Sequence, residues 1–301
     1  MMVSHPVSPD HLNIVQRSVI RRLNTEQQRL HHALASARDI DRRTLSRLET
    51  EIDRQHALIQ LALAGGIPPE WIAATQQVMN PGAPVRELSE LPTGHVDRAD
   101  LVARVTHDVA TLRTITGLDA RYGPAGLAEN RQAARRLHTV MRDRRADALI
   151  VTKLLGLEPE ETREIWTSDP GAWETDAAAR VSGLDPAVVR ARWYDAADTD
   201  TSGLRRRTAA AASAGVPPAT DVPVTTRPTD LVRGTRTRLD RSAIIHRWRN
   251  PFPGTASTAL RDAGLTGTQE WDRFADDAAE PATGVEHATP GPDPDPIGGP
   301  S

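Results

Sequence analysis

The sequence predicts an all-α fold: an N-terminal antiparallel helical hairpin and a helical bundle, with a disordered linker and a disordered C-terminal tail. Apolar residues recur at spacings of three and four, which is the period of an amphipathic helix. Proline and glycine stand where helices would begin and end. The one β-flavoured run, 222–228, contains Pro223 and Pro228, and proline lacks the N–H that a sheet needs.

Composition narrows the class of protein. With 301 residues there is room for about two domains. The 37 Lys+Arg and 40 Asp+Glu give a net charge of −3, which excludes a globally basic nucleic-acid coat. Zero cysteines exclude disulfides, cysteine nucleophiles and thiolate metal sites. Every basic residue except Lys153 is arginine, a bias typical of a GC-rich genome.

No apolar run reaches 18 residues, so we expect no transmembrane helix and no membrane partner. The first ten residues contain no apolar core of the kind that a secretory signal needs. We therefore expect a cytoplasmic protein.

Residues 1–79 are predicted to form the hairpin and a short third helix. The first helix spans about 8–38, with Ser8 as its N-cap and Pro9 at its first position. In the second helix, the apolar residues fall at heptad-like spacing: Leu45, Leu48, Ile52 and Ile59. This stripe over residues 8–66 indicates either a self-associating coiled coil or an internal hairpin packed on the rest of the chain.

A turn-rich stretch at 80–96 is expected to separate the hairpin from a bundle at 97–198. Helices of the bundle are predicted at about 97–116, 127–155, 159–167, 172–182 and 186–197. Residues 199–230 contain too little apolar surface to offset the entropy of ordering, which predicts a flexible linker. We expect a small helical segment at 231–279, with short helices near 239–249, 256–263 and 268–278, and a disordered acidic tail at 280–301.

A corner pattern recurs at four glycines, each followed by Ile or Leu: Gly66, Gly156, Gly183 and Gly264. Glycine ends helices in the left-handed conformation, so each is expected to be a C-terminal stop. An aromatic residue follows ten positions after three of these glycines: Trp166, Trp193 and Phe274. We expect these aromatic residues to anchor the core.

The corner at 178–193 resembles a helix-turn-helix. The motif has a small residue four positions before the glycine, Ala179, and apolar residues after it at Leu184, Val189 and Trp193. The resemblance covers about 20 residues and implies that the second helix enters a DNA major groove. It would present Arg190 and Arg192, with Arg180 behind them. The alternative is a glycine-terminated corner that only packs a compact helical bundle.

Charge is segregated in the last third of the chain. Residues 205–249 contain ten Arg and three Asp, whereas residues 250–301 contain two Arg and nine acids. Such a basic arm can neutralise phosphates, dock on a protein, or remain a solvated linker. The candidate nucleic-acid contacts are Arg180, Arg190, Arg192, Arg205, Arg206, Arg207, Arg233, Arg236, Arg238 and Arg241.

The sequence contains no phosphate-binding, dinucleotide-binding, zinc-protease or serine-hydrolase motif. Its ten histidines are not joined by carboxylates at ligand spacing. We therefore expect no cofactor and no metal. The predicted function is a non-enzymatic, DNA-binding protein with an accessory or regulatory role, and the alternative is a helical scaffold that binds proteins through its hairpin and its C-terminal arm.

Overall fold

The computed structural model describes residues 5–36, 41–76, 91–167, 169–217 and 227–249. The chain divides into two compact units, residues 1–244 and 245–301. Across the described residues there are ten α-helices, one short 3-10 helix and two three-residue strands, which confirms the predicted all-α fold. None of these helices is long and apolar enough to cross a membrane.

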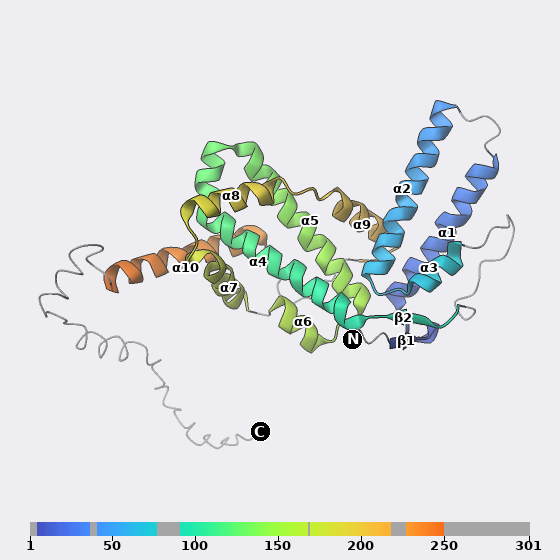
Figure 1. The fold of residues 1–301 in the computed structure, drawn as a ribbon, viewed down its shortest axis with the longest axis horizontal. Coiled ribbons are helices and arrows are strands. Elements are labelled where there is room, and N and C mark those ends of the chain that lie inside the picture. Colours follow the sequence, from blue (N-terminus) through green and yellow to red (C-terminus); the bar gives the residue numbers. More distant parts are fainter. Residues whose placement is uncertain (1–4, 37–40, 77–90, 168, 218–226, 250–301) are drawn as a thin grey trace, which may run out of the picture. The chain divides into compact units, whose positions relative to one another are not determined.

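The hairpin consists of α1 (Ile14–Ser36) and α2 (Arg42–Ala64), which lie side by side and antiparallel (Figure 1). Ser8 caps a single 3-10 turn, η1 (Pro9–His11), and α1 begins only at Ile14, later than predicted. Asp41 caps α2 by accepting a hydrogen bond from the Thr44 amide at 2.7 Å. The predicted third helix is α3 (Pro69–Gln76).

The hairpin shares its core with the bundle, so the structure does not separate residues 1–79 as predicted. Leu58 and Leu61 of α2 pack in one buried cluster with Leu154 of the bundle and Ala211, which lies far along the chain. Two strands, β1 (His5–Val7) and β2 (Gly94–Val96), also pair in an antiparallel ribbon. Within the turn-rich stretch, residues 80–90 lie outside the described part.

The centre of the bundle is α4 (Arg98–Glu129) packed along α5 (Arg131–Leu155) (Figure 1). The predicted break between 116 and 127 is wrong, because α4 runs continuously through this stretch. Its glycines permit close packing by other helices: a Cβ on Gly117 would lie 2.3 Å from the Ala177 carbonyl oxygen, and one on Gly126 would lie 2.8 Å from the Trp193 ring. Packing across these positions outweighs the low helix propensity of glycine.

Pro124 lies inside α4 and has no N–H to donate to the carbonyl of Ala120, four residues earlier. That carbonyl instead accepts a hydrogen bond of 3.1 Å from Nε of Arg236, on α10 (Pro228–Arg249). A helix more than a hundred residues away in sequence thus satisfies the polar group that the proline leaves open.

Three short helices follow close to their predicted ranges: α6 (Pro159–Trp166), α7 (Pro170–Ser182) and α8 (Pro186–Ala197). Trp166 and Trp193 are fully buried, as expected of core anchors, whereas Phe274 lies outside the described residues. Gly156 ends α5 with a left-handed φ of 57°. Gly183 differs from the prediction, because it follows α7 with a φ of −89°.

The flexible linker predicted at 199–230 is wrong for most of its described residues. Residues of this stretch form α9 (Ser202–Ser213), which packs between α2 and α5, and α10 already begins at Pro228. Ala210, Ala211, Ala214 and Val216 are buried there. Small side chains allow close approach of α9 to its neighbours, so little apolar surface per residue is enough for docking. Residues 218–226 lie outside the described part.

Candidate nucleic-acid interface

The ten arginines predicted to contact nucleic acid lie on four helices. Arg180 is on α7 and Arg190 and Arg192 are on α8, while α9 and α10 carry the rest: Arg205, Arg206, Arg207, Arg233, Arg236, Arg238 and Arg241. The basic arm is therefore ordered helix over much of its length, and its arginines differ in what they contact.

Three of these arginines hold helices in place. Arg207 donates two hydrogen bonds, of 2.9 and 2.5 Å, to the buried carboxylate of Asp147 on α5, and this contact raises the pKa of Arg207. Arg236 donates to the Ala120 carbonyl, and Arg238 contacts Glu174 of α7 at 3.1 Å. Arg207 thus uses two of its donors within the fold, and Arg236 and Arg238 use one each.

Two others pair with an acid on their own helix: Arg180 with Asp176 at 3.1 Å, and Arg233 with Asp230 at 3.2 Å. Three are exposed and make no hydrogen bond or ion pair with any residue that the structure describes: Arg192, Arg206 and Arg241. Arg180 and Arg233 are thus held only by an acid one turn away on the same helix, and the other three by no polar contact with a described residue.

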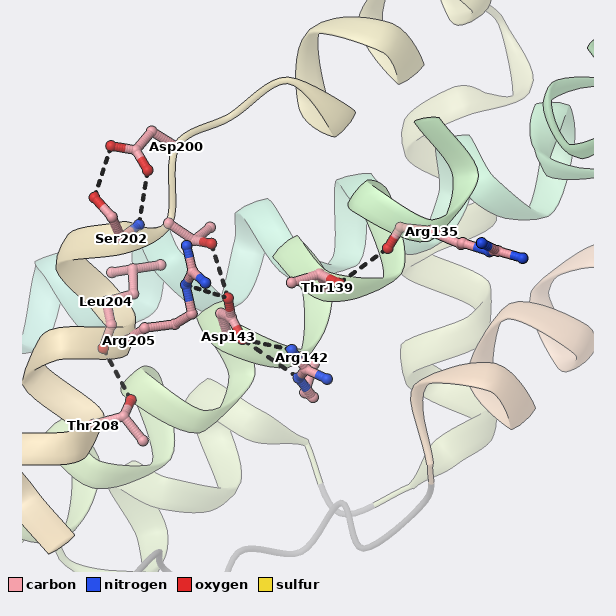
Figure 2. Close-up of polar contacts among 10 residues, drawn as sticks. Arg135, Thr139, Arg142, Asp143, Asp200, Ser202, Leu204, Arg205 and Thr208 are labelled. Carbon is pink, nitrogen blue, oxygen red and sulfur yellow. Dashed lines mark hydrogen bonds and ion pairs between the residues drawn. The ribbon is translucent and has the colours of Figure 1, made fainter. Parts of the chain in front are cut away.

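Arg205 belongs to a different arrangement, centred on Asp143 of α5 (Figure 2). The carboxylate of Asp143 is 6% exposed and accepts a hydrogen bond of 2.8 Å from the Thr201 hydroxyl. Arg142 approaches one of its oxygens at 3.3 Å, and Arg205 approaches the other at 3.5 Å. One buried carboxylate therefore holds two guanidinium groups, on side chains that remain 71% and 60% exposed.

Arg142 continues a stripe of exposed arginines along α5. Arg131 and Arg135 are four residues apart, and Arg142 follows seven residues after Arg135, so all three lie on one side of the helix. We call Arg131, Arg135, Arg142 and Arg205 the α5–α9 arginine face. Sequence reasoning missed the first three as site residues, although their spacing is visible once the helix is known.

The acids beside this face are already engaged. Asp198, which ends α8, pairs with Arg136 at 2.6 Å. Asp200 accepts hydrogen bonds of 2.8 Å from both the amide and the hydroxyl of Ser202, and these bonds lower the pKa of Asp200 (Figure 2). Asp200 therefore shapes the first turn of α9 and Asp198 holds the end of α8 to α5, while the four arginines remain exposed.

A second cluster joins α8 to the end of α4, and we call it the tyrosine cluster: Tyr122, Glu129, Arg190, Trp193 and Tyr194. One oxygen of Glu129 accepts the Tyr122 hydroxyl at 2.7 Å and the Tyr194 hydroxyl at 3.4 Å. Arg190 lies 3.1 Å from the same oxygen. These are the only two tyrosines in the sequence, and their convergence was not predicted.

The aromatic rings of this cluster meet edge to face. Trp193 lies 5.4 Å from Tyr122 and 5.0 Å from Tyr194, measured between ring centroids. The indole N–H of Trp193 donates to the buried carboxylate of Asp119 at 3.2 Å. The other oxygen of Asp119 contacts His138 of α5 at 3.1 Å. The hydrogen bond to Asp119 raises the pKa of His138. These contacts fix α8 on α4 and α5.

The helix-turn-helix resemblance agrees with the structure only in part. Val189 and Trp193 are buried as the motif requires, and Arg190 and Arg192 are exposed on α8. Ala179, which should pack between the two helices, is exposed, because α7 turns Ala177, Ala178 and Val181 inward instead. The second helix is accessible, but it is held by α4 and α5.

Two other kinds of site that the described residues could form are a ligand cavity and a metal site. A cavity of ≈ 20 Å³, room for about one water molecule, is lined mostly by apolar side chains of α4, α5, α6, α7 and α10, with Arg145 at its wall. The structure groups no three metal-ligating side chains among the residues it describes.

The chain matches no model of a known protein family, no curated protein and no solved structure.

Proposed function

We propose that this protein binds nucleic acid through phosphate contacts made by the α5–α9 arginine face, in an accessory rather than a catalytic role. The observation that carries the proposal is the pair of exposed guanidinium groups of Arg142 and Arg205, held together at the buried carboxylate of Asp143. An arginine has five N–H donors, so each keeps donors for a phosphate oxygen. Arg131 and Arg135 extend the same charge along α5.

Arginines that are ordered before binding lose less rotamer freedom on contact than those of a mobile arm. Asp143 supplies that order for Arg142 and Arg205, while Thr201 occupies the remaining hydrogen-bonding capacity of the carboxylate. On α8, Arg190 and Arg192 add further exposed positive charge. Contacts of this kind position a nucleic acid without reading its sequence.

A gel-shift titration of the full chain with duplex and single-stranded DNA at several salt concentrations tests the proposal. Three or four phosphate contacts predict that log K falls against log salt with a slope of about −3 for duplex DNA. The variant Arg142→Ala/Arg205→Ala should weaken binding at low salt and reduce the slope by about 2.

The matched control is Arg163→Ala, on α6, where the arginine is exposed beside Glu160 and makes an ion pair of 2.6 Å. This control should leave both the affinity and the slope unchanged. Absence of binding at low salt, or equal binding by the double variant and the control, would contradict the proposal.

A scaffold role is the second candidate, and a separate observation favours it. In the hairpin, Leu34, Leu45 and Ile52 are 51%, 48% and 38% exposed, although Leu48 between the last two is buried. Apolar side chains left on the surface of a helical hairpin are typical of a protein-binding face. Light scattering should then show an associated species that Leu45→Glu/Ile52→Glu returns to a monomer, and a monomeric unmodified chain would leave self-association through residues 8–66 without support.

A further inference from the structure

The tyrosine cluster has the donors of an anion site, and its acceptor is supplied by the chain itself. A guanidinium group and two hydroxyl groups surround one oxygen of Glu129, from Arg190, Tyr122 and Tyr194. Arginine and tyrosine side chains are also among the groups that bind phosphate oxygens in nucleic acids. The carboxylate therefore occupies the position that a phosphate oxygen would take.

The site holds the Glu129 carboxylate, since the hydrogen bond from Tyr122 lowers its pKa, but the place of Glu129 in its helix works against the charge. Glu129 is the last residue of α4, where the helix dipole is negative and disfavours a carboxylate. Its side chain is 43% exposed, so it can turn outward without displacing packed groups. The next helix begins immediately afterwards: the Asn130 side chain caps α5 by accepting hydrogen bonds from the amides of Gln132 and Ala133. The start of α5 adds a positive field beside the cluster.

The donors remain donors at neutral pH. Burial and the hydrogen bond to Glu129 raise the pKa of Tyr122 to about 12, so its hydroxyl stays protonated. The charge of Glu129 raises the pKa of Arg190, which stays a cation.

We propose that Arg190, Tyr122 and Tyr194 bind the terminal phosphate of a nucleic-acid strand, and that Glu129 occupies this site until the phosphate displaces it. A terminal phosphate carries a charge of about −1.5 to −2 near pH 7, whereas an internal phosphodiester carries the same single charge as the carboxylate that it would have to replace. The extra charge selects a strand end over internal phosphates. This inference rests on the proposed function and adds the part of the nucleic acid that the second site recognises.

Because Tyr122 and Tyr194 are the only tyrosines, fluorine NMR of the full chain labelled with fluorotyrosine gives two resonances that both report on this site. Short single-stranded oligonucleotides with a 5′-phosphate, a 3′-phosphate or no terminal phosphate are titrated separately, and inorganic phosphate is a fourth ligand. We expect a phosphate-ended strand and inorganic phosphate to shift both resonances, and the strand without a terminal phosphate to shift neither.

The variant Glu129→Gln removes the competing charge and keeps the shape of the side chain. It should raise the affinity for the phosphate-ended strand about 2- to 5-fold, the range of an exposed ion pair. Arg190→Gln should abolish the shift. The matched control is Glu161→Gln, which removes another surface carboxylate paired with an arginine, Arg98, and should leave the affinity unchanged.

Unshifted resonances with every phosphate-ended strand, shifts by inorganic phosphate alone, or equal affinity of Glu129→Gln and the unmodified chain would each overturn the inference. The gel-shift experiment at Arg142 and Arg205 measures a different face. If the double variant binds as tightly and with the same salt slope as the unmodified chain while phosphate-ended strands still shift both tyrosine resonances, the proposed function fails and the strand-end site stands. If the double variant loses salt-dependent binding while phosphate-ended strands leave the tyrosine resonances unshifted, the strand-end site fails and the proposed function stands.

Discussion

Helices α9 and α10 are both rich in arginine, yet they are held by the fold in different ways. On α9, Arg207 meets Asp147, a carboxylate that is almost fully buried in α5. On α10, Leu231, Val232 and Thr235 supply the buried contacts, and Arg236 donates to a backbone carbonyl. Among the described residues, Arg233 pairs only with Asp230 of its own helix, and its side chain is 78% exposed.

The difference shows that the role of an arginine depends on the group that the fold places opposite it. A buried carboxylate makes the arginine part of the structure, because neither charge can be left alone without a large desolvation cost. An exposed carboxylate on the same helix contributes little and leaves the arginine accessible to a partner. Net charge along the sequence does not distinguish these cases.

The largest effect is expected at the buried pair. Arg207→Ala leaves the carboxylate of Asp147 without its bidentate partner, and we expect the free energy of unfolding to fall by about 3 kcal/mol. Urea denaturation followed by circular dichroism measures the change. A loss no greater than that of an exposed arginine would mean that α9 is held by its alanines alone.

A smaller effect is expected where α10 meets the proline in α4. Arg236→Ala removes the donor to the Ala120 carbonyl and should cost about 1 kcal/mol. In a Pro124→Ala background, the restored N–H of residue 124 satisfies that carbonyl, so the same substitution should cost close to nothing. A double-mutant cycle measures this coupling. Additive effects of the two substitutions would show that the contact is incidental.

The smallest effect is expected at the exposed pair on α10. Arg233→Ala should change the free energy of unfolding by less than about 0.5 kcal/mol, because its partner Asp230 is solvated. The same urea experiment applies. A destabilisation comparable to that of Arg207→Ala would remove the distinction between the two helices.

Much of the fold follows from local signals in the sequence. Proline after a capping residue marks the starts of α6, α7 and α8, and apolar periodicity identifies α1, α2 and α5. The failures arise where tertiary contacts override propensity. The glycines and Pro124 in α4 read as a break, yet Trp193, Ala177 and Arg236 fill or satisfy those positions from other helices. Likewise, α9 reads as a linker because its burial depends on α2 and α5.

The candidate site was less predictable. Sequence reasoning selected Arg205 from its position in a basic run, but the partner that orients it, Asp143, is 62 residues earlier and has no local signal. Tyr122 and Glu129 lie two turns apart on α4 and so share a face, but Tyr194 joins them only because α8 packs against the end of α4. With only two tyrosines in the sequence, the composition singled out these residues but did not indicate that they meet.

The packing of α9 has a practical consequence for anyone who cuts this protein into pieces. Ala210, Ala211, Ala214 and Val216 share a buried cluster with Leu58 and Leu61 of the hairpin. A fragment that stops at residue 198, where the composition suggests a natural end, would open that cluster to water at the opposite end of the sequence. An expression boundary placed beyond residue 216 keeps the first third of the protein covered by the segment that completes it.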